Sequence, residues 1–107
     1  IQMNFQNNLA MLPAIDYLSC LNVFDANGNI VHYIAAVTGK LGSLKIYAAL
    51  ALQFDHILNQ ATAEQGMIWF AEHVADAQAQ SGQHPNIDFL LRVKNEQLVY
   101  TLAAVFI

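Results

Sequence analysis

The sequence predicts an α+β domain, with a mostly antiparallel sheet built from two β-hairpins and covered by two main helices plus a short N-terminal helix. Three observations predict it. Hydrophobic residues make up 56% of the 107 residues and charged residues 11%, which excludes a disordered chain. An Asn-Gly turn separates two short apolar runs. Two longer stretches carry apolar residues at helical spacing. We expect one domain over residues 1–107, with Ile1 and Gln2, which precede Met3, as candidates for non-native additions.

The first third of the chain predicts a helix and then a hairpin. Between Asn4 and Leu12 the apolar residues recur three or four positions apart, and Pro13 ends this helix. Residues 21–25 and 30–34 are short apolar runs on either side of Asn27-Gly28. Both residues tolerate the positive φ that a tight turn needs, so we expect a β-hairpin here.

Two helices are expected in the middle of the chain. Ser43 is suited to cap a helix that runs to about Leu58, and apolar residues cover well over a third of its circumference, which indicates a buried helix. The pattern Thr62-Ala63-Glu64-Gln65 fits a capping box. It predicts a second helix to about Gln80, ended by Ser81-Gly82.

The segment from Ile87 to Val93 permits two interpretations. Apolar residues alternate with Asp88, Leu90 and Arg92, which indicates a strand. With Asn86 as a cap, however, Asp88 and Arg92 stand four residues apart, as in a short helix. We favour the strand, which a turn at residues 94–97 would join to a further strand from Leu98 to Phe106 in a second hairpin.

Composition argues against several classes of function. Four Lys and Arg residues and a formal net charge of -4 cannot neutralise several phosphates, so we expect no nucleic-acid partner. A membrane-spanning helix needs about 20 apolar residues in a row, and no such run exists, so we expect no membrane partner. Cys20 is the single cysteine, and the N-terminal residues do not resemble a signal peptide; we expect a cytoplasmic protein.

The apolar content also predicts self-association. A domain of this length buries only about two-thirds of its unfolded surface, which leaves apolar sequence in excess. Residues 97–107 contain no charged residue, and an exposed edge strand of that kind invites aggregation. We therefore expect this strand to be central in the sheet or covered by a partner subunit, and the protein to be a homodimer.

One candidate site is acidic and rich in histidine. Helical spacing and a short loop could bring together His73, Asp76, His84 and Asp88. Two imidazoles and two carboxylates suit a divalent metal, and the same groups could carry out acid–base chemistry. The pattern matches no established ligand spacing. In the structural alternative, His84 caps a turn, Asp88 pairs with Arg92 and Asp76 is solvated.

A second candidate site lies at Gly42-Ser43, with Lys40 before the expected helix and Lys45 in its first turn. Free N–H groups and the helix dipole favour an anion at such a position. A lysine in the first turn is repelled by the positive end of the helix dipole. An anion bound between the lysine and the helix start would remove this repulsion. The structural alternative is an ordinary helix start with solvated lysines.

Residues 71–77 (Ala-Glu-His-Val-Ala-Asp-Ala), residues 84–91 (His-Pro-Asn-Ile-Asp-Phe-Leu-Leu), residues 39–44 and the Tyr47 helix resemble a family of small, uncharacterised bacterial proteins. The resemblance runs from about Gly39 to Val93 and more loosely over the whole chain. It implies a bacterial, cytoplasmic, single-domain protein. It implies no activity, because none is assigned to that family.

Three functions follow as hypotheses. The first is a non-enzymatic, homo-oligomeric module that works by binding something, since the chain carries no established catalytic motif. The second is a metal-binding protein or metal-dependent enzyme using His73, Asp76, His84 and Asp88. The third is recognition of a phosphate or carboxylate ligand by Lys40, Gly42 and Ser43.

Overall fold

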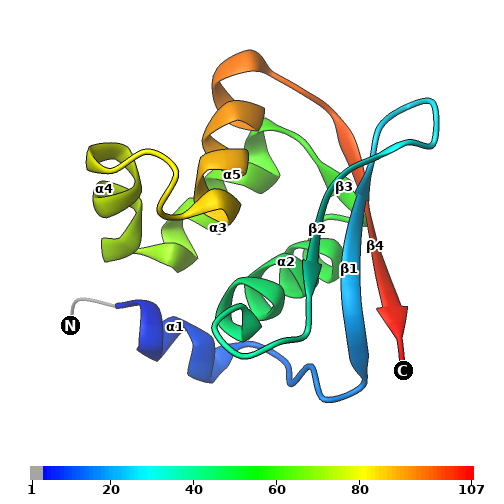
Figure 1. Ribbon diagram of the computed structural model, residues 1–107, viewed down its shortest axis with the longest axis horizontal. Coiled ribbons are helices and arrows are strands. Elements are labelled where there is room, and N and C mark those ends of the chain that lie inside the picture. Colours follow the sequence, from blue (N-terminus) through cyan, green and yellow to red (C-terminus); the bar gives the residue numbers. More distant parts are fainter. Residues whose placement is uncertain (1–3) are drawn as a thin grey trace.

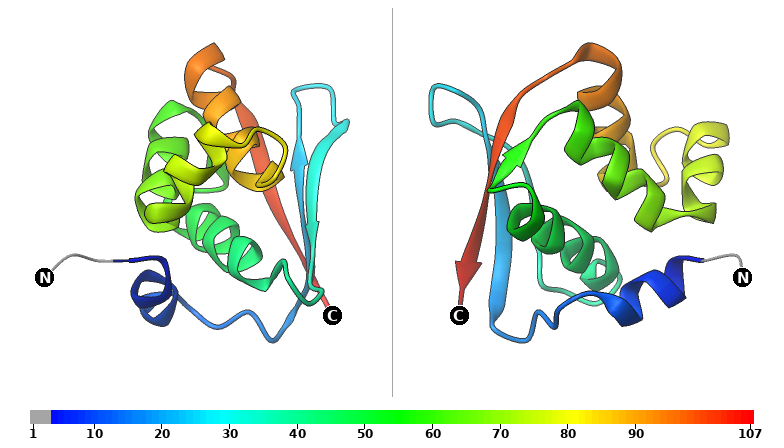
Figure 2. Two further views of the ribbon diagram at one scale, coloured as in Figure 1. Left: turned by 60° about the vertical axis from the view of Figure 1, so that its left-hand side comes forward. Right: turned by 180° about the vertical axis from the view of Figure 1, so that it is seen from behind.

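In the computed structural model, which describes residues 4–107, five helices lie on one side of a four-stranded antiparallel sheet (Figure 1). The strands follow the order β2-β1-β4-β3. Figure 2 shows from two sides that the other face of the sheet is not covered by any helix of the described residues. The predicted α+β class is confirmed, although its details differ. Ile1 and Gln2 lie outside the described residues.

The first helix and the first hairpin agree with the predictions from the sequence. Helix α1 spans Phe5–Met11, and the side chain of Asn4 caps it by accepting from the Asn7 N–H at 2.8 Å. Strands β1 (Leu18–Phe24) and β2 (Ile30–Ala35) form the predicted hairpin. In its turn Asp25 Oδ1 accepts from the N–H groups of Asn27 and Asn29, each at 2.9 Å.

The predicted second hairpin is wrong. The segment from Ile87 to Val93 belongs to helix α5 (Pro85–Glu96), and strand β4 (Tyr100–Phe106) pairs with β1 instead. Pro85 occupies the first turn, where its missing N–H costs nothing, and Asp88 and Lys94 suit the two ends of the helix dipole. Because the buried face of α5 is broad, its apolar residues also satisfy a period of two over this short segment.

The helix expected from Ser43 to Leu58 is shorter and begins earlier. Helix α2 spans Leu41–Gln53, and Ser43 lies in its first turn instead of capping it. Asp55 and His56 follow with φ of 55° and 65°, which ends the helix. The chain then forms β3 (Ile57–Leu58), a strand of two residues too short to leave a pattern in the sequence.

The helix expected over residues 62–80 is two helices, α3 (Gln60–Phe70) and α4 (Glu72–Ala79). They meet at Ala71, whose φ of 53° and ψ of -120° cost a non-glycine residue about 1–3 kcal/mol. The predicted capping box is also wrong. Asn59 caps α3 by accepting from the Thr62 N–H at 3.1 Å, and the Thr62 hydroxyl donates to the Ile57 carbonyl at 2.7 Å.

Strand β4 is central in the sheet order but only partly covered. It pairs with β1 along its length, whereas β3 reaches only Tyr100 and Thr101. Among residues 4–107, no strand pairs with the outer edge of β4 beyond Thr101.

Within the same residues, no helix has both the length and the apolar character needed to cross a bilayer.

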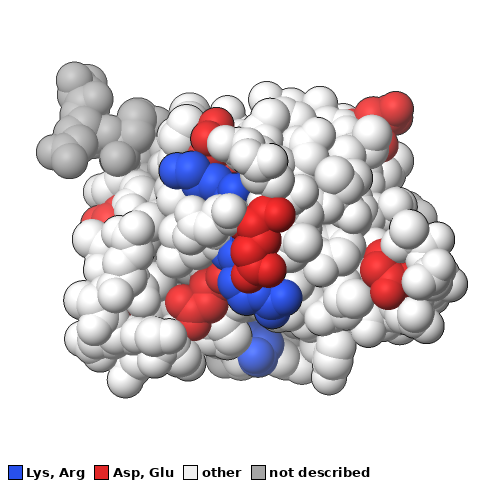
Figure 3. Space-filling model, turned by 90° about the horizontal axis from the view of Figure 1, so that it is seen from above, with Lys and Arg blue, Asp and Glu red and all other residues white. Residues whose placement is uncertain are grey.

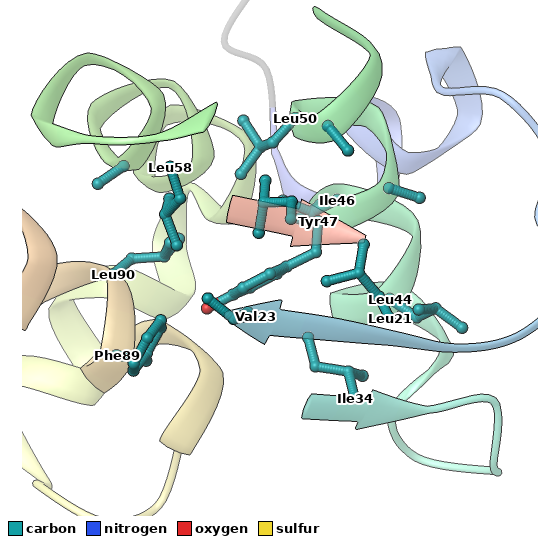
Figure 4. Packing of buried hydrophobic residues seen from close by; sticks show 14 of the residues in the cluster. Leu21, Val23, Ile34, Leu44, Ile46, Tyr47, Leu50, Leu58, Phe89 and Leu90 are labelled. Carbon is teal, nitrogen blue, oxygen red and sulfur yellow. The ribbon is translucent and has the colours of Figure 1, made fainter. Parts of the chain in front are cut away.

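The core lies between the sheet and helices α2, α3 and α5. Figure 4 shows the Tyr47 side chain extending from α2 toward Val23 of β1 and Phe89 of α5. Tyr47 is fully buried, and its hydroxyl donates to the Asn86 carbonyl at 2.6 Å. This hydrogen bond joins α2 to the first turn of α5 and so sets where these two helices begin relative to each other.

Gly66 lets α3 approach its neighbours closely. A Cβ at this position would lie 2.7 Å from Leu90 Cδ1 and 3.0 Å from Leu50 Cδ1, and both leucines are completely buried. Overpacking costs about 1–3 kcal/mol, which exceeds the gain of about 1 kcal/mol that alanine brings to a helix. We expect Gly66→Ala to lower the free energy of unfolding by about 1 kcal/mol, measured by urea denaturation.

The matched control is Gly66→Ala combined with Leu90→Ala. Removing the leucine methyl groups makes room for the new Cβ, so the double variant should lose less stability than the sum of the two single variants. Additive losses would contradict the proposed contact.

Candidate functional site

Residues from both sites predicted from the sequence line one cavity of about 470 Å³. It lies where α1, the first turns of α2 and α5, the end of α3 and the first turn of α4 meet. Lys40, Gly42 and Ser43 line it from one side, and His73 and His84 from another. The volume falls within the range of about 300–1,000 Å³ that is usual for ligand pockets.

The first turn of α2 presents free hydrogen-bond donors. The N–H groups of Leu41, Gly42 and Ser43 have no acceptor within residues 4–107, and no side chain caps the helix. All three residues line the cavity, together with Lys40 at the N-cap position. The donors and the positive end of the helix dipole therefore meet at the cavity.

The first turn of α5 adds further donors, although Pro85 has no N–H and the Ile87 N–H donates to the His84 carbonyl at 3.0 Å. No side-chain hydrogen bond caps this helix either, and Asn86 in its first turn lines the cavity. The Asn86 side chain is 8% exposed, and its Oδ1 accepts from His32 Nε2 at 2.7 Å. Its NH₂ group has no partner in the part of the chain that the structure describes. The His32 bond therefore leaves the donor end of the amide for the cavity.

His32 is held by packing as well as by this hydrogen bond. Its ring stacks on Phe89 with centroids 4.4 Å apart and an interplanar angle of 6°. Burial lowers the pKa of His32; the Asn86 bond acts in the opposite direction, and the charges of Lys40 and Arg92 lower the pKa further. Neither His32 nor Asn86 was predicted as a site residue. The alternation along residues 30–34, which places His32 on the same face as Ile34, was the available signal.

The four residues of the predicted metal site are only partly brought together. His84 Nε2 and Asp76 Oδ2 lie 2.5 Å apart, and the His73 and His84 rings are 5.7 Å apart. Asp88 Oδ2 instead accepts from the Gly82 N–H at 2.9 Å and closes the loop before α5. Within residues 4–107, no three His, Cys, Asp or Glu side chains are grouped so that they could hold a metal ion. The metal site stays a prediction from the sequence.

The remaining wall of the cavity is apolar. Phe5 and Leu9 of α1 and Phe70 of α3 line it. The Phe5 ring lies parallel to Phe70 at 6.0 Å and edge-on to His73 at 4.6 Å. A Cβ on Gly42 would lie 2.8 Å from Phe5 Cζ, so glycine allows Phe5 to reach the start of α2.

Helix α4 also holds α1 in place at this wall. The Phe5 N–H donates to Glu72 Oε1 at 2.9 Å, and this bond is the main cause of the lowered pKa of Glu72. The break at Ala71 is what turns Glu72 and His73 toward α1.

The charge of the cavity differs from that of the chain. The chain carries a formal net charge of -4, yet among the described residues that line the cavity there is one lysine and no Asp or Glu. On the face seen in Figure 3, the Lys and Arg side chains lie beside acidic ones and form no broad basic patch. The local surplus of positive charge and N–H donors favours an anionic ligand.

The fold and the cavity define the class of protein: a small α+β domain with a cavity walled by helices. It belongs to the family described as "Uncharacterized protein conserved in bacteria (DUF2322)", whose model matches residues 5–104. The resemblance seen in the sequence is thereby confirmed. A search of curated proteins and of solved structures finds no match to this chain.

The depressed pKa of His32 makes a prediction for stability. Because the folded protein holds this proton less tightly than the unfolded chain, whose histidine pKa is about 6.5, stability is complete above that pH and falls as the pH drops through the folded-state pKa. We expect the free energy of unfolding to fall less between pH 7 and pH 5 in His32→Gln, which keeps a donor for Asn86, than in the wild type.

Urea denaturation at the two pH values measures this difference, with His56→Gln, an exposed histidine, as the control. The control should keep the loss seen in the wild type. Equal losses in the wild type and His32→Gln would contradict the role assigned to His32 burial.

Proposed function

We propose that this protein is a cytoplasmic, non-enzymatic binding module whose cavity takes a small anion. One observation carries the proposal: two helix starts without side-chain caps, those of α2 and α5, converge on the cavity beside Lys40. A helix N-terminus is equivalent to roughly half a positive charge. Asp88 in the first turn offsets this charge in α5, whereas α2 has no acidic residue in its first turn, so the α2 start and the Lys40 ammonium group supply most of the charge that favours an anion.

The donors suit an oxyanion, meaning a phosphate or a carboxylate. The N–H groups of Leu41, Gly42 and Ser43 form one set of donors, and the Asn86 NH₂ group supplies another. Hydrogen bonds to a charged acceptor are roughly twice as strong as neutral ones. Such a ligand also resolves the unfavourable position of Lys40 at the positive end of the α2 dipole.

Inorganic phosphate should therefore raise the melting temperature. A ligand at a hundred times its Kd adds about 2.7 kcal/mol, which raises the Tm of a domain of this size by at least several degrees. We expect the rise with phosphate, relative to chloride at equal ionic strength, to disappear in Lys40→Ala. Differential scanning fluorimetry with EDTA present measures it without a contribution from metal.

Lys45→Ala is the matched control, because Lys45 lies on the same helix but does not line the cavity. It should keep the full rise. No rise in the wild type, or equal losses in the two lysine variants, would contradict the proposal. The metal hypothesis predicts a different result: Zn²⁺ without EDTA raises Tm, and His73→Ala and His84→Ala remove the effect.

We further propose that two copies of this module form a homodimer through the uncovered face of the sheet. None of the four strands contains Asp, Glu, Lys or Arg. Tyr33, Val105 and Ile57 on this face are 63%, 36% and 43% exposed. In a chain with a net charge of -4, a charge-free face is where a second copy can approach without like-charge repulsion.

A lysine in this face should separate the copies. Val105 pairs with Cys20 across β1 and β4, the two central strands of the sheet. We expect sedimentation velocity at micromolar concentration to give a dimer for the wild type and a monomer for Val105→Lys. Ile68→Lys, which replaces an exposed residue of α3, should stay dimeric. A monomeric wild type would contradict the proposal.

A further inference from the structure

We infer that the anion is carried on an aromatic body, so that the ligand is an organic phosphate or carboxylate with a planar apolar ring. This inference rests on the proposed function. The proposed function concerns the charged group of the ligand, and this inference concerns the rest of the ligand. It is argued from the wall of the cavity opposite the helix starts.

The cavity is too large for a simple anion alone. It is open to solvent and has a volume of about 470 Å³, whereas one water molecule occupies about 30 Å³ of liquid. An inorganic phosphate held at the helix starts would leave most of this volume to water. That water would lie against Phe5, Leu9 and Phe70, which offer it no hydrogen bond.

The rings in this wall favour a flat partner. Phe5 is only half-buried although it contacts both Phe70 and His73, so part of its ring remains accessible from the cavity. Aromatic pairs prefer offset-stacked or edge-to-face arrangements with centroids about 4.5–7 Å apart. An aromatic ring on the ligand can extend this arrangement, while its anionic group reaches the N–H groups of α2.

The polar groups define the other end of the ligand. Asn86 is nine-tenths buried, and the His32 bond directs its acceptor away from the cavity, so the amide offers N–H to an acceptor on the ligand. Lys40 is the one Lys or Arg among the described residues that line the cavity, and no carboxylate there would pair with a cationic ligand. The ligand is therefore an acid and not an amine.

Matched probes separate the two halves of the inference. Isothermal titration calorimetry would compare phenyl phosphate with methyl phosphate, which has no ring, and with phenol, which has no anionic group. A second pair, benzoate and acetate, makes the same comparison with a carboxylate. We expect the ring to lower Kd at least tenfold in the pair whose anionic group fits, and phenol to bind more weakly than either phosphate ester.

Phe5→Leu should reduce this ring effect, and Phe106→Leu, which replaces an exposed phenylalanine of β4, should leave it unchanged. The wild-type comparison stands even if Phe5→Leu does not fold. Equal affinities with and without the ring overturn the inference and leave small-anion binding intact. Phenol binding as tightly as phenyl phosphate overturns the inference too. Binding of neither phosphate, carboxylate nor phenol overturns the proposed function itself.

Discussion

The hydrogen bond from the Tyr47 hydroxyl to the Asn86 carbonyl is the constraint on which the rest of the structure depends. Tyr47 is completely buried, and a buried hydroxyl without a hydrogen-bond partner costs free energy. Helix α5 must therefore begin where the Asn86 carbonyl can accept this bond. Burial also raises the pKa of Tyr47 well above its usual value, which keeps the hydroxyl protonated as a donor. One interior contact thus places the first turn of α5 against α2, and the cavity lies between the two helix starts.

The other walls of the cavity depend on local backbone features that cost stability or restrict which residue can occupy a position. Ala71 adopts a positive φ that turns α4 toward α1, and Glu72 then holds the Phe5 N–H. Gly42 leaves room for the Phe5 ring at the start of α2. Strain of this kind persists when the surrounding structure compensates for it, and it often accompanies ligand sites. Of the four described non-glycine residues with positive φ, Ala71 alone is next in the sequence to a residue that lines the cavity.

Sequence patterns predicted the elements whose signal is local and missed those that depend on distant contacts. The Asn27-Gly28 turn and the helix between Asn4 and Leu12 depend on local sequence, and both predictions are confirmed. The segment 87–93 satisfies two periods at once, and only packing against α3 decides for a helix. Lys40, Gly42, Ser43, His73 and His84 were found as candidates, but nothing local shows that they share one cavity. Asn86 was considered only as a helix cap, and its bond to His32 joins residues 54 positions apart.

The most direct test of a shared site at two helix starts is a titration of the ¹⁵N-labelled protein with inorganic phosphate, followed by two-dimensional NMR. If one anion is held by both helices, the backbone amides of Gly42 and Ser43 in α2 and of Asn86 in α5 shift together and give a single Kd. Shifts confined to one helix, or largest on the uncovered face of the sheet, would contradict a site built from both.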